Sequence, residues 1–386
     1  MKVLVAHSFY RQPGGEDSYV RQQVEALSGH HDVELLERRN DDLSGGASTW
    51  AVMATGKAVQ TEVDAMFDSF RPDVVHVHNT YPSLGPSIHQ AAERRDIPLV
   101  MTVHNFRLRC PNGYMFTNGE LCRRCEGGNY TNAVVHSCFE TRAQAAGYAS
   151  ALWLHRFILK LEDKVTRFVA PSEFTAGRLR DWGIDDSRIS VIHNFTNLPE
   201  TVAPPGGFGL YLGRMSPEKG LDTLVDALAV AGDPDFVLAG DGPELAPLIE
   251  RARALALDRT RFVGRRSRAE VAELTRDARY LVMSSRSEEN APLAALEAMA
   301  AGKPLIATSL GGLSELVTDG RGIAVAPADI ADLAAAIREL CDDETRCAAL
   351  GAAARAFAEA NCTSEAHVAA LTRCYEEVLG SRSSSS

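Results

Sequence analysis

The sequence lacks a long apolar run, an excess of positive charge and any internal repeat. None of its apolar stretches approaches the roughly 18 residues that a membrane-spanning helix needs. Acidic residues outnumber basic ones by 51 to 40, and the net charge of −11 argues against a nucleic-acid partner bound through a basic surface. What is there is an ordinary globular composition, with 45% hydrophobic residues in 386, enough for two or three domains.

The start of the chain does not look like a signal peptide. The segment MKVLVAHS contains only a short apolar stretch and reads as a first strand. We therefore expect a cytoplasmic protein, with a peripheral position at the inner face of the plasma membrane left open. In that compartment thiols stay reduced, so the eight cysteines are not expected to pair.

Strand-like and helix-like segments alternate along almost the whole chain. Six β-rich segments lie before residue 198 and six more follow residue 207, with helices of 3.6 period between them. This alternation predicts an α/β protein with two doubly wound Rossmann-like domains facing across a cleft. The Pro- and Gly-rich segment around residues 196–208 predicts the boundary between them.

The resulting division has three parts. Residues 1–198 are expected to form an N-terminal domain, with a cysteine-rich insert at 107–142, and residues 199–365 a second domain. Residues 366–386 contain a last helix, expected to pack back on the N-terminal domain, and a polar tail. Ligands of such sheets bind beyond the carboxyl ends of the strands, so residues just after strands are the candidates.

Two cations follow the first strand of the second domain. Arg214 comes directly after the strand, and Lys219 stands where the next helix begins. Two fixed cations next to the amides of a helix N-terminus form an anion site that suits a diphosphate. A solvated surface loop is the alternative, because most arginines and lysines are exposed.

Two glutamates follow the fourth strand of that domain. Glu289 lies in the loop after the strand, and Glu297 lies more than one turn inside the next helix. Pro292 suits the first turn of this helix and Asn290 suits its cap. Carboxylates in this place can accept hydrogen bonds from vicinal hydroxyls, although a helix carboxylate more often faces solvent.

Together these segments resemble the family 4 glycosyltransferases, which have the two-domain GT-B fold. The match covers nearly the whole chain in the family's order. Its parts are Glu289-x7-Glu297 followed by AMAAGKP, Gly213-Arg214-x4-Lys219-Gly220, Gly14-Gly15, and residues 73–78, 102–104, 170–173, 239–244 and 311–315.

The resemblance implies a retaining hexosyltransferase that moves a sugar from a UDP or GDP sugar to a hydroxyl acceptor, in glycan, glycolipid or glycosylated-metabolite biosynthesis. It implies that Arg214 and Lys219 hold the diphosphate in place of a metal, so no cofactor is expected for catalysis. The pattern Asp233-Pro-Asp235 precedes its strand, at the wrong end of the sheet for a metal site, and predicts a turn.

Further roles are implied by the same resemblance. The catalytic residues would be Glu289, His104, Arg214 and Lys219. Binding of the donor would involve Gly14, Gly15, Gly240, Gly242, Asn290, Ala291 and Glu297 as well as the two cations. For His104 a purely structural role is the alternative. A catalytically silent nucleotide-sugar-binding protein and another GT-B enzyme, such as a nucleotide-sugar epimerase, also stay open.

A cysteine-rich segment directly follows His104. Its thiols have the spacing C-x11-C-x2-C-x12-C, which is half of a convincing zinc pattern: Cys110, Cys122, Cys125 and Cys138. We expect a structural zinc, with four reduced thiols or disulfides as alternatives. Because of its position the segment should shape the acceptor pocket.

A helix is predicted over residues 151–165, with Trp153, Phe157 and Ile158 among basic residues. Such a helix can lie on an anionic membrane, so peripheral membrane contact is one reading. Packing of its apolar stripe into the core is the reading that we favour.

Overall fold

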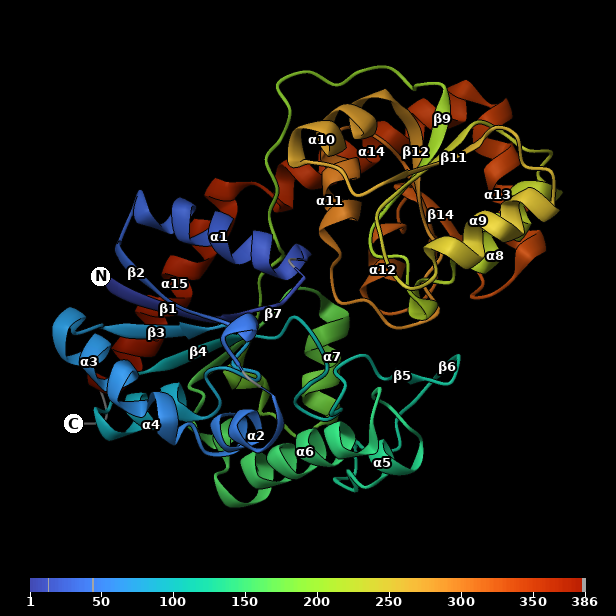
Figure 1. Cartoon of the computed structure of the whole chain (residues 1–386). Helices are drawn as coiled ribbons and strands as arrows, with labels where there is room; N and C mark the ends of the chain where they lie inside the picture. Colours follow the sequence, from blue (N-terminus) through green and yellow to red (C-terminus); the bar gives the residue numbers. More distant parts are fainter. Residues whose placement is uncertain (13, 44, 384–386) are drawn as a thin grey trace. The chain divides into compact units, whose positions relative to one another are not determined.

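The chain divides into two compact units in the computed structural model, which describes residues 1–12, 14–43 and 45–383. One unit comprises Met1–Asn118, Cys122–Ile192 and His367–Ser386, and the other comprises Gly119–Leu121 and His193–Ala366. Each unit is built on a parallel sheet of six strands with helices around it (Figure 1). The predicted α/β fold with two parallel sheets is confirmed.

The sheet of the first unit has the strand order β2-β1-β3-β4-β7-β8. Its strands are β1 (Lys2–Phe9), β2 (Asp32–Arg39), β3 (Val74–Val77), β4 (Leu99–Thr102), β7 (Arg167–Ala170) and β8 (Ile189–Val191). The order of connection reverses between β1 and β3, and such a reversal is where open parallel sheets bind their ligands. The short strands β5 (Phe116–Thr117) and β6 (Glu120–Leu121) form a separate pair.

Helices cover both faces of the first sheet (Figure 1). On one face, α3 (Gln60–Phe70), α4 (Ser87–Arg94) and α7 (Glu173–Asp181) share one apolar core with the strands, and α7 lies against β7 and β8. On the other face lie α1 (Gly15–Ser28) and the last helix, α15 (Ser364–Ser383). His76 of β3 is hydrogen-bonded to Tyr375 of α15 at 2.6 Å and to Gln23 of α1 at 3.3 Å. The unit also contains α2 (Gly46–Thr55), α5 (Asn132–Val135) and α6 (Arg142–Trp153).

The helix predicted over residues 151–165 is interrupted, so that prediction is wrong. After α6, a π-helical turn covers Leu154–Ile158, and Lys160 has a left-handed backbone with φ 46° that ends the helix. A 3-10 turn then covers Leu161–Lys164.

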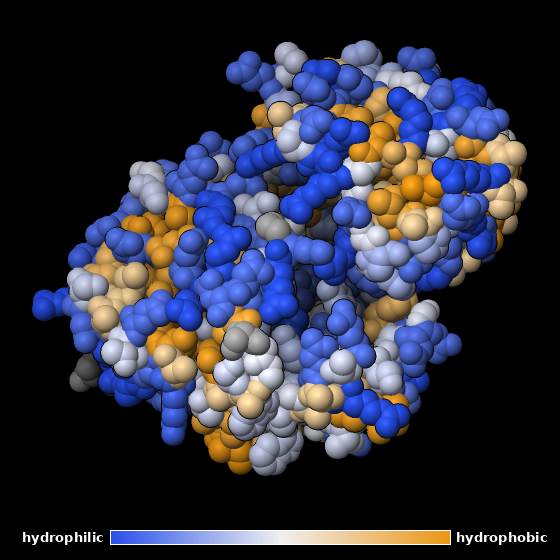
Figure 2. Space-filling model, viewed as in Figure 1, coloured by the Kyte–Doolittle hydropathy of each residue, from blue (hydrophilic) through white to orange (hydrophobic). Residues whose placement is uncertain are grey.

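The predicted packing of this segment's apolar stripe is found only in part. Leu161 is buried, whereas three apolar side chains are 43–58% exposed: Trp153, Phe157 and Ile158. On the face that Figure 2 shows, hydrophobic residues form several patches bordered by hydrophilic ones. No helix in the described part of the chain is long and apolar enough to cross a membrane.

The sheet of the second unit has the strand order β11-β10-β9-β12-β13-β14. Its strands are β9 (Phe208–Leu212), β10 (Phe236–Ala239), β11 (Thr260–Gly264), β12 (Ala278–Met283), β13 (Leu305–Thr308) and β14 (Gly322–Val325). This is the order of dinucleotide-binding sheets, and the connection reverses between the neighbours β9 and β12. Loops that follow these two strands therefore define the expected ligand position.

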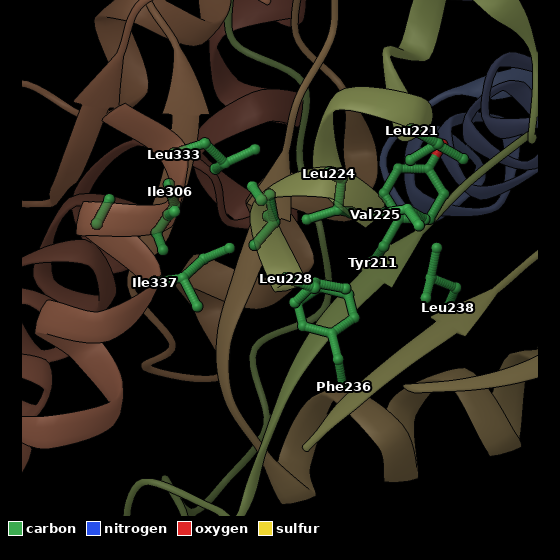
Figure 3. Close-up of a cluster of buried hydrophobic side chains, with 14 of the residues drawn as sticks. Tyr211, Leu221, Leu224, Val225, Leu228, Phe236, Leu238, Ile306, Leu333 and Ile337 are labelled. Atoms are coloured by element: carbon green, nitrogen blue, oxygen red, sulfur yellow. The ribbon is translucent and has the colours of Figure 1, made fainter. Parts of the chain in front are cut away.

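Two apolar layers hold the second sheet between its helices. On one face, α8 (Leu221–Val230), α9 (Leu245–Ala254) and α13 (Ile330–Asp342) pack against Tyr211 and Phe236, as Figure 3 shows for α8. The other face carries α10 (Arg268–Asp277), α11 (Leu293–Ala300), α12 (Gly312–Leu316) and α14 (Glu344–Asn361). Each large apolar side chain buried here stabilises the unit by about 1.5–3 kcal/mol.

Candidate active site

Arg214 and Lys219 follow β9, at the reversal of the second sheet. A 3-10 turn formed by Pro217–Lys219 leads into α8, and Gly220 caps that helix with a left-handed φ of 63°. Arg214 is exposed, whereas Lys219 is half-buried, with its Nζ 2.5 Å from Oε1 of Glu289. The two predicted cations thus stand beside the start of a helix, as an anion site requires.

Glu289 lies in the loop that follows β12, the strand next to β9. Its Oε1 accepts hydrogen bonds from Lys219 Nζ at 2.5 Å and from Ser285 Oγ at 2.7 Å. Burial raises the pKa of this carboxyl group, but the charge of Lys219 and the two hydrogen bonds outweigh burial and hold its pKa below the usual range. Glu289 is therefore an ionised hydrogen-bond acceptor, and hydrogen bonds from Lys219 and Ser285 hold its side chain in place.

Glu297 lies in α11, one turn and more from the start of that helix. Burial raises the pKa of Glu297, and the charge of Arg268 only partly opposes this. The prediction that Asn290 caps the helix is wrong. Pro292, with an extended ψ of 128°, occupies the cap position, and the carbonyl of Ala291 accepts a hydrogen bond from Asn194 Nδ2 at 3.0 Å.

Gly240 and Gly242 follow β10 and pack on the segment that carries Arg214. Their φ angles are 149° and 155°. A Cβ on Gly240 would lie 1.8 Å from the carbonyl oxygen of Gly213, and one on Gly242 would lie 2.2 Å from that of Met215. The two glycines therefore let the loop after β10 support the loop after β9.

Gly14 and Gly15 mark the start of α1 in the first unit, and both are exposed. No atom lies within 4 Å of a Cβ placed on Gly14, and its φ is −124°. We expect Gly14→Ala to leave thermal stability unchanged and to raise the donor KM about tenfold or more, if this loop approaches the phosphates. Gly242→Ala, by contrast, should lower the unfolding midpoint by several degrees. Melting curves of the two variants side by side check this, and an equally early transition in Gly14→Ala would contradict it.

His104 belongs to a buried stack of histidines in the first unit. Its Nε2 lies 2.8 Å from Nδ1 of His78, and the His76 and His78 rings stack with centres 4.5 Å apart. Burial lowers the pKa of His104 to about 4 and that of His76 to about 3. At neutral pH these rings are uncharged hydrogen-bonding groups.

His104 also lines a pocket of the first unit. The pocket holds about 650 Å³ of space outside the protein atoms, part of it open to solvent, and Tyr81, Arg107 and His155 are among its walls. The sequence reasoning missed Arg107 and Ser285 as site residues. Their positions just after β4 and β12 were the available signal, because residues after strands of such sheets face the ligand.

Two segments carry residues of a kind that can bind metal: the Asp233-Pro-Asp235 pattern, which was predicted to be a turn, and the cysteine-rich insert, which was predicted to bind zinc. Asp233 has a left-handed φ of 54° and precedes β10, and both Asp233 and Asp235 bind Arg259 at 2.5–3.0 Å. The pattern thus precedes its strand, as predicted, in an irregular segment that follows a turn at residues 231–232. The four cysteines of the insert line one small cavity, together with Asn132 and His136.

Zinc binding by the insert stays a prediction. Within residues 1–12, 14–43 and 45–383, no group of three or more His, Cys, Asp or Glu side chains is placed to hold a metal ion. The thiols therefore share a cavity without forming a ligand cluster. Metal analysis of protein purified without chelators decides the question: the prediction requires about one zinc per chain, and under about a tenth of that removes it.

Two family models match the chain in sequence order. Residues 13–199 match the model described as Glycosyltransferase Family 4, and residues 204–357 match that of Glycosyl transferases group 1. The chain belongs to glycosyltransferase family 4. A family relative, the glycogen synthase of Mycobacterium tuberculosis, is 32% identical over 284 residues, which are 71% of this chain and 61% of the relative. The family 4 chain thus spans less than two thirds of that relative's length.

Solved structures share the fold of this family 4 chain. The sucrose-phosphate synthase from Thermosynechococcus elongatus gives a TM-score of 0.74 at 20% identity, covering 99% of this chain and 100% of that one. The Anabaena protein HepE in complex with UDP and glucose gives 0.71 at 20% identity, covering 98% and 100%. The GT-B fold predicted from the sequence is confirmed.

Proposed function

We propose that the chain is a retaining hexosyltransferase that uses a UDP or GDP sugar and a hydroxyl acceptor, in glycan, glycolipid or glycosylated-metabolite biosynthesis. The observation that carries the proposal is the Lys219–Glu289 pair at the strand reversal of the second sheet, with Arg214 beside it. Fixed cations bind a diphosphate, and an ionised carboxylate accepts hydrogen bonds from the hydroxyl groups of a sugar. A further support is that the related fold of HepE holds UDP-glucose.

In the proposed reaction the bond between the sugar C1 and the diphosphate oxygen breaks, and a bond between C1 and the acceptor oxygen forms on the same face. The acceptor proton passes to the departing phosphate oxygen. Arg214 and Lys219 neutralise the negative charge that develops on the leaving group, which is the largest contribution expected from the protein. The two cations neutralise the leaving diphosphate, which a divalent metal ion does in metal-dependent transferases.

The two glutamates position the donor in this proposal. Glu289 accepts a hydrogen bond from a hydroxyl of the sugar while its other partner, Lys219, faces the diphosphate. Glu297 accepts hydrogen bonds from the ribose hydroxyls. Because one carboxylate holds the cation and the sugar together, binding of each part of the donor reinforces binding of the other.

A screen of nucleotide sugars tests the proposal. At least one UDP or GDP hexose should raise the unfolding midpoint by about 2–4 °C and be hydrolysed slowly without an acceptor. Incubation of that donor with cell extract should yield a glycosylated product that retains the anomeric configuration. Stabilisation without turnover would indicate a silent binding protein, and a changed sugar still attached to its nucleotide would indicate an epimerase. Failure of every nucleotide sugar to stabilise the chain would contradict the proposal.

A further inference from the structure

The pocket of the first unit lies just beyond β3 and β4. It contains charged side chains to which the proposed function assigns no role. Its histidines are uncharged at neutral pH, since burial lowers the pKa of His155 to about 4 and that of His89 to about 3, as it does for His104. Charge in the pocket therefore comes from Arg107, Arg156 and Glu162.

Arg107 is a guanidinium without an acidic partner. Its Nε is buried and makes no hydrogen bond, and its Nη1 donates only a long 3.4 Å bond to the carbonyl of Pro111. Tyr81 and Tyr148 present their rings to it, each with its centre 5.4 Å from the guanidinium carbon. No carboxylate of the described residues forms an ion pair with Arg107. Arg107 as a whole is half-buried, but its Nε is buried without a partner, so the hydrogen bonding of this guanidinium is incomplete.

The acids near this pocket are committed to other partners. Glu162 is bound by both terminal nitrogens of Arg109, one of them at 2.8 Å, so its charge is already neutralised. Glu16 accepts a hydrogen bond from the hydroxyl of Tyr10 at 3.0 Å. Tyr10 is neutral and Glu16 Oε1 makes no hydrogen bond, so Glu16 keeps its charge, but neither Glu16 nor Glu162 forms an ion pair with Arg107 among the described residues.

Arg156, the second cation of the wall, binds neutral groups. It donates to the carbonyl of Glu126 at 3.0 Å and to the hydroxyl of Tyr130 at 3.1 Å. With Glu162 neutralised, the wall carries an excess of positive charge. Two guanidinium groups around an otherwise largely apolar pocket favour a ligand with one compact negative group.

We propose that this pocket binds an anionic group of the acceptor, a phosphate monoester or a carboxylate, and that Arg107 is its ligand. The inference rests on the proposed function, because it takes the first unit to hold the acceptor. Arg107 offers a planar fork of donors that matches either oxyanion, and Tyr81 and Tyr148 hold the guanidinium plane. His104 lines the same pocket, so the acceptor's hydroxyl and its anionic group would share one site.

Phosphate binding tests Arg107 without a known acceptor. The background is the double variant Arg214→Ala/Lys219→Ala, which removes the other proposed anion site. In that background inorganic phosphate, at about ten times its dissociation constant, should raise the unfolding midpoint by about 2–4 °C. Adding Arg107→Met should abolish this shift. Arg21→Met is the matched control, because Arg21 also lies over an aromatic ring, Phe9, in the same unit. A phosphate shift that survives Arg107→Met overturns the proposal.

Inhibition of donor hydrolysis and transfer separates the two oxyanions. In the wild-type chain a hexose 6-phosphate or a hexuronate should bind at least about tenfold more tightly than the parent hexose, and Arg107→Met should remove that preference. If the hexose 6-phosphate inhibits more strongly, the pocket prefers a phosphate, and if the hexuronate does, it prefers a carboxylate. Equal binding of the neutral hexose overturns the inference. Stabilisation by a nucleotide sugar is read independently in the second unit, so loss of that signal would instead count against the proposed function.

Discussion

Replacing Lys219 with Ala is expected to lower kcat/KM for the donor about 10²–10³-fold, and Arg214→Ala should cause a comparable loss. In the proposed reaction both cations stand where negative charge develops as the nucleotide leaves, so their effect should be larger in the transition state than in the bound substrate. Lys219 also fixes Glu289 at 2.5 Å, which adds a loss of sugar positioning to its variant. Steady-state hydrolysis and transfer assays with the best donor measure both constants.

Folding has to be separated from catalysis in the Lys219 variant. Lys219→Ala leaves the buried carboxylate of Glu289 with only the Ser285 hydroxyl as a donor, which costs stability. The double variant Lys219→Ala/Glu289→Gln should recover the melting temperature but not the turnover. Arg253→Ala is the control for loss of an arginine, because Arg253 is exposed on α9 and, among the described residues, its ion pair is with the equally exposed Glu250. Near-normal turnover in both Arg214→Ala and Lys219→Ala would show that the diphosphate binds elsewhere.

The free energy of unfolding should fall steeply as the pH drops from 6.5 towards 4. The cause is a set of buried histidines whose pKa values burial lowers to about 3 or 4: His76, His89, His104 and His155. Between the unfolded value near 6.5 and these folded values, the unfolded state binds more protons than the folded state, so stability rises with pH. The full contribution is present above pH 6.5 and is lost as the pH falls.

The expected size follows from the linkage. One pKa unit corresponds to about 1.4 kcal/mol, so at pH 5 each of these histidines costs about 2 kcal/mol of stability relative to pH 7. Denaturant unfolding at pH 7, 6 and 5 measures the total. Replacing His89 with Gln should make the dependence shallower, whereas replacing the exposed His30 should not change it. A flat stability profile from pH 7 to 5 would show that the rings are not buried in neutral form.

The sequence predicted the candidate site residues that directly follow strands. Arg214, Lys219 and Glu289 were identified because each follows a β-rich segment, and parallel sheets bring the ends of such segments to one edge. The alternation of β-rich and helical segments predicted both six-stranded sheets for the same reason.

The sequence predicted that the last helix packs on the first domain, but not which side chains meet there. The hydrogen bond between His76 and Tyr375 joins residues 299 positions apart, and no local pattern announces it. That Arg107 has no ion pair among the described residues could not be predicted either, because it depends on which carboxylates pair with other cations in the folded chain. The break after α6 was missed because Lys160 adopts a left-handed backbone that its residue type does not favour.

The position of α15 has a consequence for how the chain folds during synthesis. The first unit includes residues from His367 onward, where Tyr375 is hydrogen-bonded to His76 of β3 and His367 to Tyr19 of α1. While the ribosome makes the second unit, the part of this face that α15 covers is therefore exposed, with only α1 packed beside it. We expect a fragment ending at Ile192 to aggregate unless residues 367–383 are supplied in trans or grafted to it.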